Sequence, residues 1–394
     1  MVTPSDEEVK VVESRLVTPS EETPRKGLWL SPLDLSLANR GHTPLVYLYR
    51  SRAAVKDDIF FDVARLTAAM ARALVSFYPL AGRLGVDGDG RLQVDCAEAE
   101  QGVPFVVAHS HLTVDHFSNF KPSPELRRLF VPCLDDSPSV VCAIQVTFMR
   151  CGGVALGVAV HHAVVDGIST FHFLGTWSDF SSRDRDCPAV AALELPCHDR
   201  SLLRPRSPPV VHHDALSVFF PELSPSENEM SDVVVNEIFV ISKDQVAALN
   251  KRACTSGSDG AASTFCTLSA HVWRCLCAAR RLPPDATTRL TFPANVRRSL
   301  RPPLPDSYFG NGIIVLGSTG KVRDIIAPES SEEPLASVAG RVRRAIRRMD
   351  SELVRSAMDY LELQMADSLP APGTPVGRLT ETELMVVSVR NKHV

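Results

Sequence analysis

Short apolar runs of strand length alternate with segments of helical periodicity along this chain, and this alternation limits its fold more than any other feature. Pro44–Arg50, Val140–Phe148 and Gly153–His161 are strand-like, whereas Phe60–Ser76 and Ile168–Phe180 repeat apolar residues at the spacing of one helix face. The alternation predicts an α/β fold. A chain of 394 residues is long enough for two domains with separate cores.

The same pattern continues to the C-terminal end of the chain. We expect a hairpin at Leu84–Val94, strands at Val233–Ile241, Leu290–Pro293 and Gly312–Leu316, and helices at Ser242–Ala253, Ser263–Arg281 and Pro334–Gln364, with Ser242 as an N-cap. Residues 187–209 are rich in Pro, Asp and Arg and indicate an exposed crossover. The predicted boundaries are therefore an N-terminal domain at 1–186, a crossover loop at 187–210 and a C-terminal domain at 211–394.

Composition and charge argue against several classes of protein. The net charge of -4 gives no general attraction to nucleic acid or to an anionic membrane surface. The longest apolar runs are shorter than the ~20 residues of a membrane-spanning helix, and the polar, acidic start of the chain does not match a signal peptide. The ten cysteines include no Cys-x-x-Cys pair, so we expect reduced core thiols and a cytoplasmic protein.

A polar cluster follows directly after the apolar strand Val154–Val160. It begins with His161 and His162 and ends with Asp166 and Gly167. Strand ends of α/β folds are where reactive side chains reach a cleft. A neutral imidazole can take a proton from an attacking hydroxyl or amine, and a glycine permits a tight backbone bend that could set its angle. We therefore predict that His162 is a general base.

Two other interpretations of the cluster remain open from the residues alone. His162 and Asp166 could form a buried pair that only closes a turn. They could also share a metal ion, since they stand four residues apart. However, the nearest third ligand is His161, which faces the opposite side if the strand continues. We expect no metal site.

Several motifs together resemble the plant BAHD acyltransferases. They are HxxxDG at His162–Gly167, YPLAGR at Tyr78–Arg83, and the region NVRR at Asn295–Arg298 followed by PPLP at Pro302–Pro305 and YFGN at Tyr308–Asn311. The resemblance runs from about Gly27 to about Val387. It implies two domains like chloramphenicol acetyltransferase with a solvent channel between them. Acyl-CoA would enter that channel from one face and the acceptor from the other.

The resemblance also implies roles for the residues of the cluster. His162 would be the general base, Asp166 would orient the loop by pairing with an arginine, and Gly167 would be structural. Arg297 and Arg274 are the two candidates for the arginine. Acyl-CoA would be a co-substrate in a direct transfer, without an acyl-enzyme, a metal or a bound cofactor. The enzyme would be a monomer whose partners are small molecules, with no nucleic acid and no membrane.

Local strings resemble the hydroxycinnamoyl-CoA branch of the family. There, residues matching His42 and Tyr47 line the channel near the acceptor. Cys197–Leu203 and Ser356–Leu361 resemble grass enzymes that acylate amines such as tryptamine, putrescine or agmatine. We therefore expect hydroxycinnamoyl transfer to an amine, with a hydroxyl acceptor such as shikimate or quinate as the alternative. Ser263 and Thr264 match a region near the CoA pantetheine, although plain N-capping explains them equally well.

The DFGWG signature of the family is absent from this sequence. Leu379–Ser388 resembles the strand that precedes it, but Val389 stands at the family's tryptophan position and the chain ends at Val394. The expectation is a C-terminally truncated member with an exposed sheet edge and reduced stability. Two alternatives remain. One is a non-catalytic relative that still binds acyl-CoA or protein. The other is a peptide-synthesis condensation domain, because that class usually has a doubled histidine and His161-His162 matches it.

Overall fold

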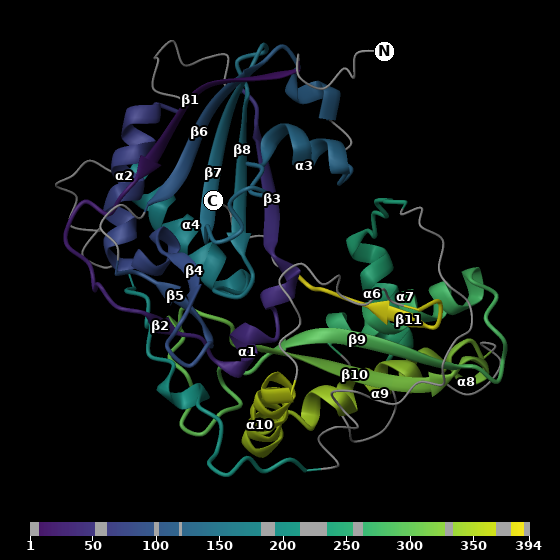
Figure 1. The fold of residues 1–394 in the computed structure, drawn as a ribbon. Helices are drawn as coiled ribbons and strands as arrows, with labels where there is room; N and C mark the ends of the chain where they lie inside the picture. Colours follow the sequence, from purple (N-terminus) through teal and green to yellow (C-terminus); the bar gives the residue numbers. More distant parts are fainter. Residues whose placement is uncertain are drawn as a thin grey trace.

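The computed structural model describes residues 8–51, 61–97, 102–117, 120–182, 194–212, 235–254, 263–327, 334–367 and 380–389. Helices and strands alternate through these ranges (Figure 1), which confirms the α/β prediction. We call residues 8–182 the N-terminal half and residues 235–389 the C-terminal half. No helix in the described ranges is both long enough and apolar enough to span a bilayer.

A mixed five-stranded sheet in the order β1-β6-β7-β8-β3 is the centre of the N-terminal half. Only β6 and β7 are parallel neighbours; the other pairs are antiparallel. The strands are β1 (Val9–Val17), β3 (His42–Tyr49), β6 (Val103–Ser110), β7 (Cys142–Met149) and β8 (Val154–His161). The predictions for β3, β7 and β8 are confirmed, whereas β1 and β6 were not predicted.

Helices cover both faces of this sheet (Figure 1), and β8 is buried along its whole length as a result. The even-numbered residues of β8, from Val154 to Val160, belong to the core under α2 (Val63–Ser76) and α4 (Gly167–Ser182). Its other face packs against α3 (Pro124–Phe130). There Gly157 has to be glycine, because an added Cβ would lie 1.6 Å from the Phe130 carbonyl oxygen.

A small antiparallel sheet in the order β2-β5-β4 lies beside the large one. It consists of β2 (Leu28–Trp29), β4 (Arg83–Val86) and β5 (Leu92–Asp95), and it confirms the predicted hairpin. The YPLA residues before β4 form a buried 3₁₀ turn, Tyr78–Ala81. A Cβ on Gly82 would lie 2.7 Å from the Asp95 carbonyl oxygen, so the end of this motif is fixed by close backbone approach.

The C-terminal half is built on a three-stranded sheet in the order β10-β9-β11. Strands β9 (Thr287–Asn295) and β10 (Ile313–Lys321) are antiparallel, and the short β11 (Glu383–Met385) joins β9 in parallel. Its helices are α6 (Lys243–Arg252), α7 (Thr264–Ala279), α8 (Val322–Ile325), α9 (Pro334–Arg347) and α10 (Ser351–Asp367). Trp273 of α7 is fully buried in this second core, where its Nε1 donates to Thr288 Oγ1 at 3.0 Å.

The single helix predicted at Pro334–Gln364 is wrong, because the chain forms two helices there. Helix α9 ends at Arg347 and α10 starts at Ser351. Asp350 accepts a hydrogen bond from the Leu353 N–H at 2.8 Å, which caps the new helix. The apolar period continues across the break, so the cap residue was the only signal that could have revealed it.

The strand predicted at Val233–Ile241 is also wrong for the residues that the structure describes there. Residues 235–241 carry no strand assignment, and Phe239 and Val240 are 85% and 88% exposed. An isolated extended segment is not stable as sheet without a neighbouring strand. The segment is rich in β-branched residues, but no described strand pairs with it.

Two further predictions concern the cysteines and the division into domains. The nine described cysteines are free, but only some are core thiols, since four are buried and four are exposed. The two main cores agree with a two-domain division, although the halves interlock: Leu33 belongs to the C-terminal core and Phe309 to the N-terminal one. The boundaries at 186 and 210 stay predictions, because 183–193 and 213–234 lie outside the described residues.

Candidate active site

His162 lies directly after β8, where the chain leaves the large sheet. Its backbone N–H donates to the Gly41 carbonyl at 2.9 Å, and its own carbonyl accepts from Asn311 Nδ2 at 2.8 Å. Its side chain is only partly buried, so the ring keeps access to solvent. The imidazole is thus presented at a strand end by a backbone that is held from both halves of the molecule.

The electrostatic environment keeps the His162 imidazole neutral. Burial lowers the pKa of His162, and the positive charge of Arg40 lowers it further. The backbone of His162 itself, the carboxylate of Asp166 and the side chain of Asn311 oppose that shift without reversing it. At neutral pH the ring therefore carries a free lone pair, as a general base requires.

Asp166 and Arg297 form a buried, bidentate ion pair beside His162. Arg297 Nη1 lies 2.7 Å from Asp166 Oδ2 and Nη2 lies 3.1 Å from Oδ1, with both side chains 2% exposed. Asp166 also accepts from the backbone N–H of Ser169 at 2.9 Å and of Gly312 at 3.0 Å. It therefore caps α4 and ties the loop after His162 to the C-terminal half.

Nη2 of Arg297 also makes hydrogen bonds outside the ion pair. Its Nη2 donates to the carbonyls of Tyr308 at 3.2 Å and Gly310 at 3.3 Å, and to Ser169 Oγ at 3.2 Å. Asp166 is thus fully occupied with holding the fold together and does not contact the imidazole of His162 through any described hydrogen bond.

Arg274, the other predicted partner of Asp166, is not at the site. It lies on α7 and donates to the carbonyls of Ile325 at 3.1 Å and Ala327 at 3.0 Å. The sequence alone could not show which of the two arginines reaches Asp166, because both follow apolar residues in the C-terminal half.

The tight bend predicted at Gly167 does not occur. Gly167 is the first residue of α4, and its φ lies outside the left-handed region that favours glycine. The nearest atom to an added Cβ would be Phe171 Cε2 at 4.0 Å, so the position is open. The backbone alone therefore does not require glycine at this helix start.

Of the two predicted acceptor contacts, only His42 lies near His162. His42 pairs with His161 across β3 and β8, its Nε2 donates to the Val140 carbonyl at 2.6 Å, and burial lowers its pKa. Tyr47 pairs with Leu156, five strand positions further along, which is about 17 Å away. Tyr47 is therefore distant from His162 along the strand, and substrate contact by either residue stays a prediction.

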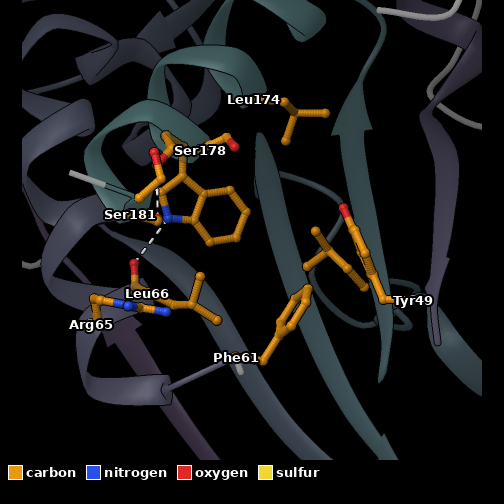
Figure 2. A pocket seen from close by; sticks show the side chains of 10 residues that line it. Tyr49, Phe61, Arg65, Leu66, Leu174, Ser178 and Ser181 are labelled. Carbon is orange, nitrogen blue, oxygen red and sulfur yellow. Dashed lines mark hydrogen bonds between the residues drawn. The ribbon is translucent and has the colours of Figure 1, made fainter. Parts of the chain in front are cut away.

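Tyr47 lies instead near a separate hollow of about 240 Å³ between the large sheet and helices α2 and α4 (Figure 2). Its lining includes Tyr49, Leu156 and Trp177, whose Nε1 donates to the Leu66 carbonyl at 2.9 Å. Tyr49 pairs with Val154, seven strand positions or about 24 Å from the end that carries His161. The hollow is therefore distinct from the site at His162.

Ser263 and Thr264 both make local contacts at the start of α7. Ser263 is the N-cap residue, with its Oγ accepting from the Cys266 N–H at 3.3 Å, and Thr264 Oγ1 accepts from Asn250 Nδ2 at 3.2 Å. Both side chains are exposed. N-capping explains Ser263, and contact of either residue with CoA stays a prediction.

Asp34 and Arg200 form a second buried ion pair that was not predicted. Arg200 Nε lies 3.1 Å from Asp34 Oδ2, and Asp34 Oδ1 accepts from both nitrogens of Asn311 at 2.9 Å. The Ser31-x-x-Asp34 spacing is that of a capping box, which the structure contains. That signal could have placed Asp34 at a helix start, but not its contact with Arg200, 166 residues away.

His161 should make the protein sensitive to acid. Burial, with the charges of His42 and His162, lowers the pKa of His161 to about 3, whereas an unfolded chain would protonate it near 6.5. The unfolded state then binds more protons between these values, so stability is lost as the pH falls through that window. The unfolding free energy of the native protein should fall between pH 7.5 and pH 5. In His161→Asn this fall should be roughly 1–2 kcal/mol smaller. Urea titrations at both pH values measure this, and equal losses in both proteins would contradict it.

No group of three or more His, Cys, Asp and Glu side chains within the described ranges is arranged to hold a metal ion. The site consists of the imidazole of His162, two buried ion pairs behind it, and Asn311 between them. This arrangement can accept a proton from a bound nucleophile while the surrounding backbone stays fixed.

The chain is similar to several known proteins. The model of the Transferase family matches residues 7–394. The chain is 41% identical to putrescine hydroxycinnamoyltransferase 1 of Oryza sativa subsp. japonica, over 96% of this chain and 84% of that protein. It is 39% identical to shikimate O-hydroxycinnamoyltransferase of Nicotiana tabacum, over 90% and 80%. The crystal structure of F. graminearum TRI101 complexed with coenzyme A and T-2 mycotoxin superposes with a TM-score of 0.68 at 17% identity, covering 92% of this chain and 83% of that one.

Proposed function

Because this chain belongs to the Transferase family, the plant BAHD acyltransferases that use CoA thioesters, we propose that it transfers a hydroxycinnamoyl group from CoA to an amine. The observation that carries the proposal is the neutral, partly exposed imidazole of His162, presented where the two halves meet. Relatives that are named for hydroxycinnamoyl transfer support the acyl group. Putrescine, agmatine and tryptamine are the acceptors to be expected.

The chemistry follows from a base next to two substrates. The amine nitrogen attacks the thioester carbonyl while His162 takes the proton that the nitrogen loses. The carbon–sulfur bond then breaks, the carbon–nitrogen bond remains, and the proton passes to the CoA thiolate. Positioning two substrates together supplies much of the rate, and the general base adds roughly 10²–10⁴-fold. We propose that acyl-CoA and acceptor approach His162 from opposite sides of the junction between the halves.

A hydroxyl acceptor such as shikimate or quinate is the second candidate, and one residue favours it. Arg40 is exposed and near enough to His162 for its charge to lower the pKa of the imidazole. Shikimate carries a carboxylate, which a guanidinium binds well. An aliphatic amine is a cation in water, with a pKa near ~10.4, and is repelled by the same charge.

A panel of acceptors separates the two candidates. With p-coumaroyl-CoA as donor, we expect kcat/KM for putrescine, agmatine or tryptamine to exceed that for shikimate or quinate by at least about ten-fold, which is ~1.4 kcal/mol of discrimination. Arg40→Ala should raise kcat/KM for the diamine and lower it for shikimate. Turnover with shikimate alone, abolished in Arg40→Ala, would contradict the proposed amine acceptor.

We further infer that the protein is a cytoplasmic monomer that needs no bound cofactor besides its acyl-CoA co-substrate. The same proposal includes the domain boundaries at 186 and 210. It also includes a contact of Ser263 and Thr264 with CoA. Their support is the family match and the exposed position of both hydroxyl side chains at the start of α7.

A further inference from the structure

A chain of buried polar groups runs from Arg200 to the backbone of His162. It passes from Arg200 Nε to Asp34 Oδ2 at 3.1 Å, from Asp34 Oδ1 to Asn311 Nδ2 at 2.9 Å, and from the same Nδ2 to the His162 carbonyl at 2.8 Å. Asp34 and Asn311 are fully buried. A buried charge pair is costly unless its hydrogen bonds are satisfied. We therefore expect these hydrogen bonds to hold the four groups in fixed positions.

The contact with Asp34 fixes which way the Asn311 amide faces. An ionised carboxylate can only accept hydrogen bonds, and Asp34 forms a buried ion pair with Arg200. Asn311 must therefore turn its NH₂ group toward Asp34, which leaves its Oδ1 on the other side. This Oδ1 is buried and has no hydrogen-bond partner among the described residues.

One ring nitrogen of His162 also lacks a hydrogen-bond partner within the described ranges. Its Nδ1 is likewise buried without a partner in the described part of the chain. Asn311 Nδ2 holds the carbonyl of the same residue at 2.8 Å, so the other buried atom without a partner, Asn311 Oδ1, belongs to a side chain next to residue 162. A ring nitrogen that faces acceptors carries the proton of the neutral imidazole.

We propose that Asn311, locked by Asp34 and Arg200, is a positioning residue that keeps the proton of neutral His162 on Nδ1 and leaves Nε2 free as the base. The inference rests on the proposed role of His162 and names what fixes its tautomer. The Asn311 side chain and the His162 backbone both raise the pKa of the ring, as acceptors of a ring proton should. With the other tautomer, Nε2 would be a donor and could not take the proton of the nucleophile.

The test measures the tautomer directly in the full-length protein without substrate. Nitrogen-15 NMR of histidine-labelled protein at pH 7.5 distinguishes protonated from unprotonated ring nitrogens, and His162→Ala identifies the His162 signals by their loss. The native protein should show a protonated Nδ1 and an unprotonated Nε2. Asn311→Ala should move the ring toward the Nε2-protonated form and lower kcat by about 10- to 100-fold, with KM for p-coumaroyl-CoA within about two-fold.

A matched control is available in Gln145, another buried amide. Its Nε2 donates to the Leu129 carbonyl at 2.8 Å and to Thr147 Oγ1 at 3.0 Å, without contact to His162. Gln145→Ala should lower stability but leave both the tautomer and kcat unchanged. Asp34→Asn, which removes only the charge that orients the amide, should shift the tautomer in the same direction as Asn311→Ala.

Two results would overturn the inference: a native His162 that carries its proton on Nε2, or a tautomer that neither Asn311→Ala nor Asp34→Asn changes. If Asn311→Ala fails to fold, the native spectrum and Asp34→Asn still decide. The proposed function fails separately, because the tautomer is read without acyl-CoA. A protein inactive with every hydroxycinnamoyl acceptor, but with an Asn311-dependent Nδ1 proton on His162, would sink only the proposed function.

Discussion

His162→Ala is expected to lower kcat/KM for acyl transfer by about 10²–10⁴-fold while the protein keeps its fold. The variant loses the imidazole that accepts the nucleophile's proton, but it retains the binding of both substrates, so some turnover remains. Its side chain is partly exposed, and the contacts that hold residue 162 come from its backbone N–H and carbonyl. Truncation should therefore cost little stability.

Release of the CoA thiol from p-coumaroyl-CoA in the presence of putrescine measures this loss. The control is His111→Ala, which removes an exposed imidazole from the loop after β6 and should leave kcat/KM unchanged. Circular dichroism and thermal melts of both variants should match the native protein. Activity of His162→Ala within a few-fold of native would show that another group is the base.

Arg297→Ala is expected to destabilise the protein by about 3–5 kcal/mol, because it leaves the buried carboxylate of Asp166 without its partner. Asp166 and Arg297 are each 2% exposed, so the remaining carboxylate lies in a buried environment. The same variant removes the hydrogen bonds to the Tyr308 and Gly310 carbonyls. Against a typical total stability of roughly 5–15 kcal/mol, this is a large fraction.

The neighbouring arginine provides a matched control. Arg298 pairs with Asp306 at 3.0 Å, but the two side chains are 83% and 65% exposed. Such an exposed surface pair contributes little to stability, so Arg298→Ala should unfold in urea almost as the native protein does. Equal midpoints for Arg297→Ala and Arg298→Ala would contradict a structural role for the Asp166 pair.

The central strands and the position of the base could be predicted because both leave local signals. Strands β3, β7 and β8 are short runs rich in apolar residues, and His162 and Asp166 follow β8 directly. By contrast, β1 is an edge strand whose residues are mostly exposed, so it shows no alternation of buried and exposed positions. Its pairing with β6 depends on residues that lie about ninety positions further along the chain.

The parts of the site that escaped prediction depend on contacts between distant residues. Arg297 and Arg274 could not be distinguished by sequence, since only the fold brings one of them to Asp166, 131 residues away. Asp34, Arg200 and Asn311 come from three separate segments that meet behind His162. The separation of Tyr47 from His162 could not be predicted either, because it depends on strand register, which the sequence does not show.

The release of CoA from p-coumaroyl-CoA, measured with and without putrescine, tests the central claim most directly. If His162 draws a proton from a bound amine during direct transfer, free CoA should appear only when the amine is present, in equal amount with the amide product. Release of CoA without any acceptor, with the coumaroyl group left on the protein, would contradict the account. So would the absence of release with every amine and alcohol offered to a folded protein.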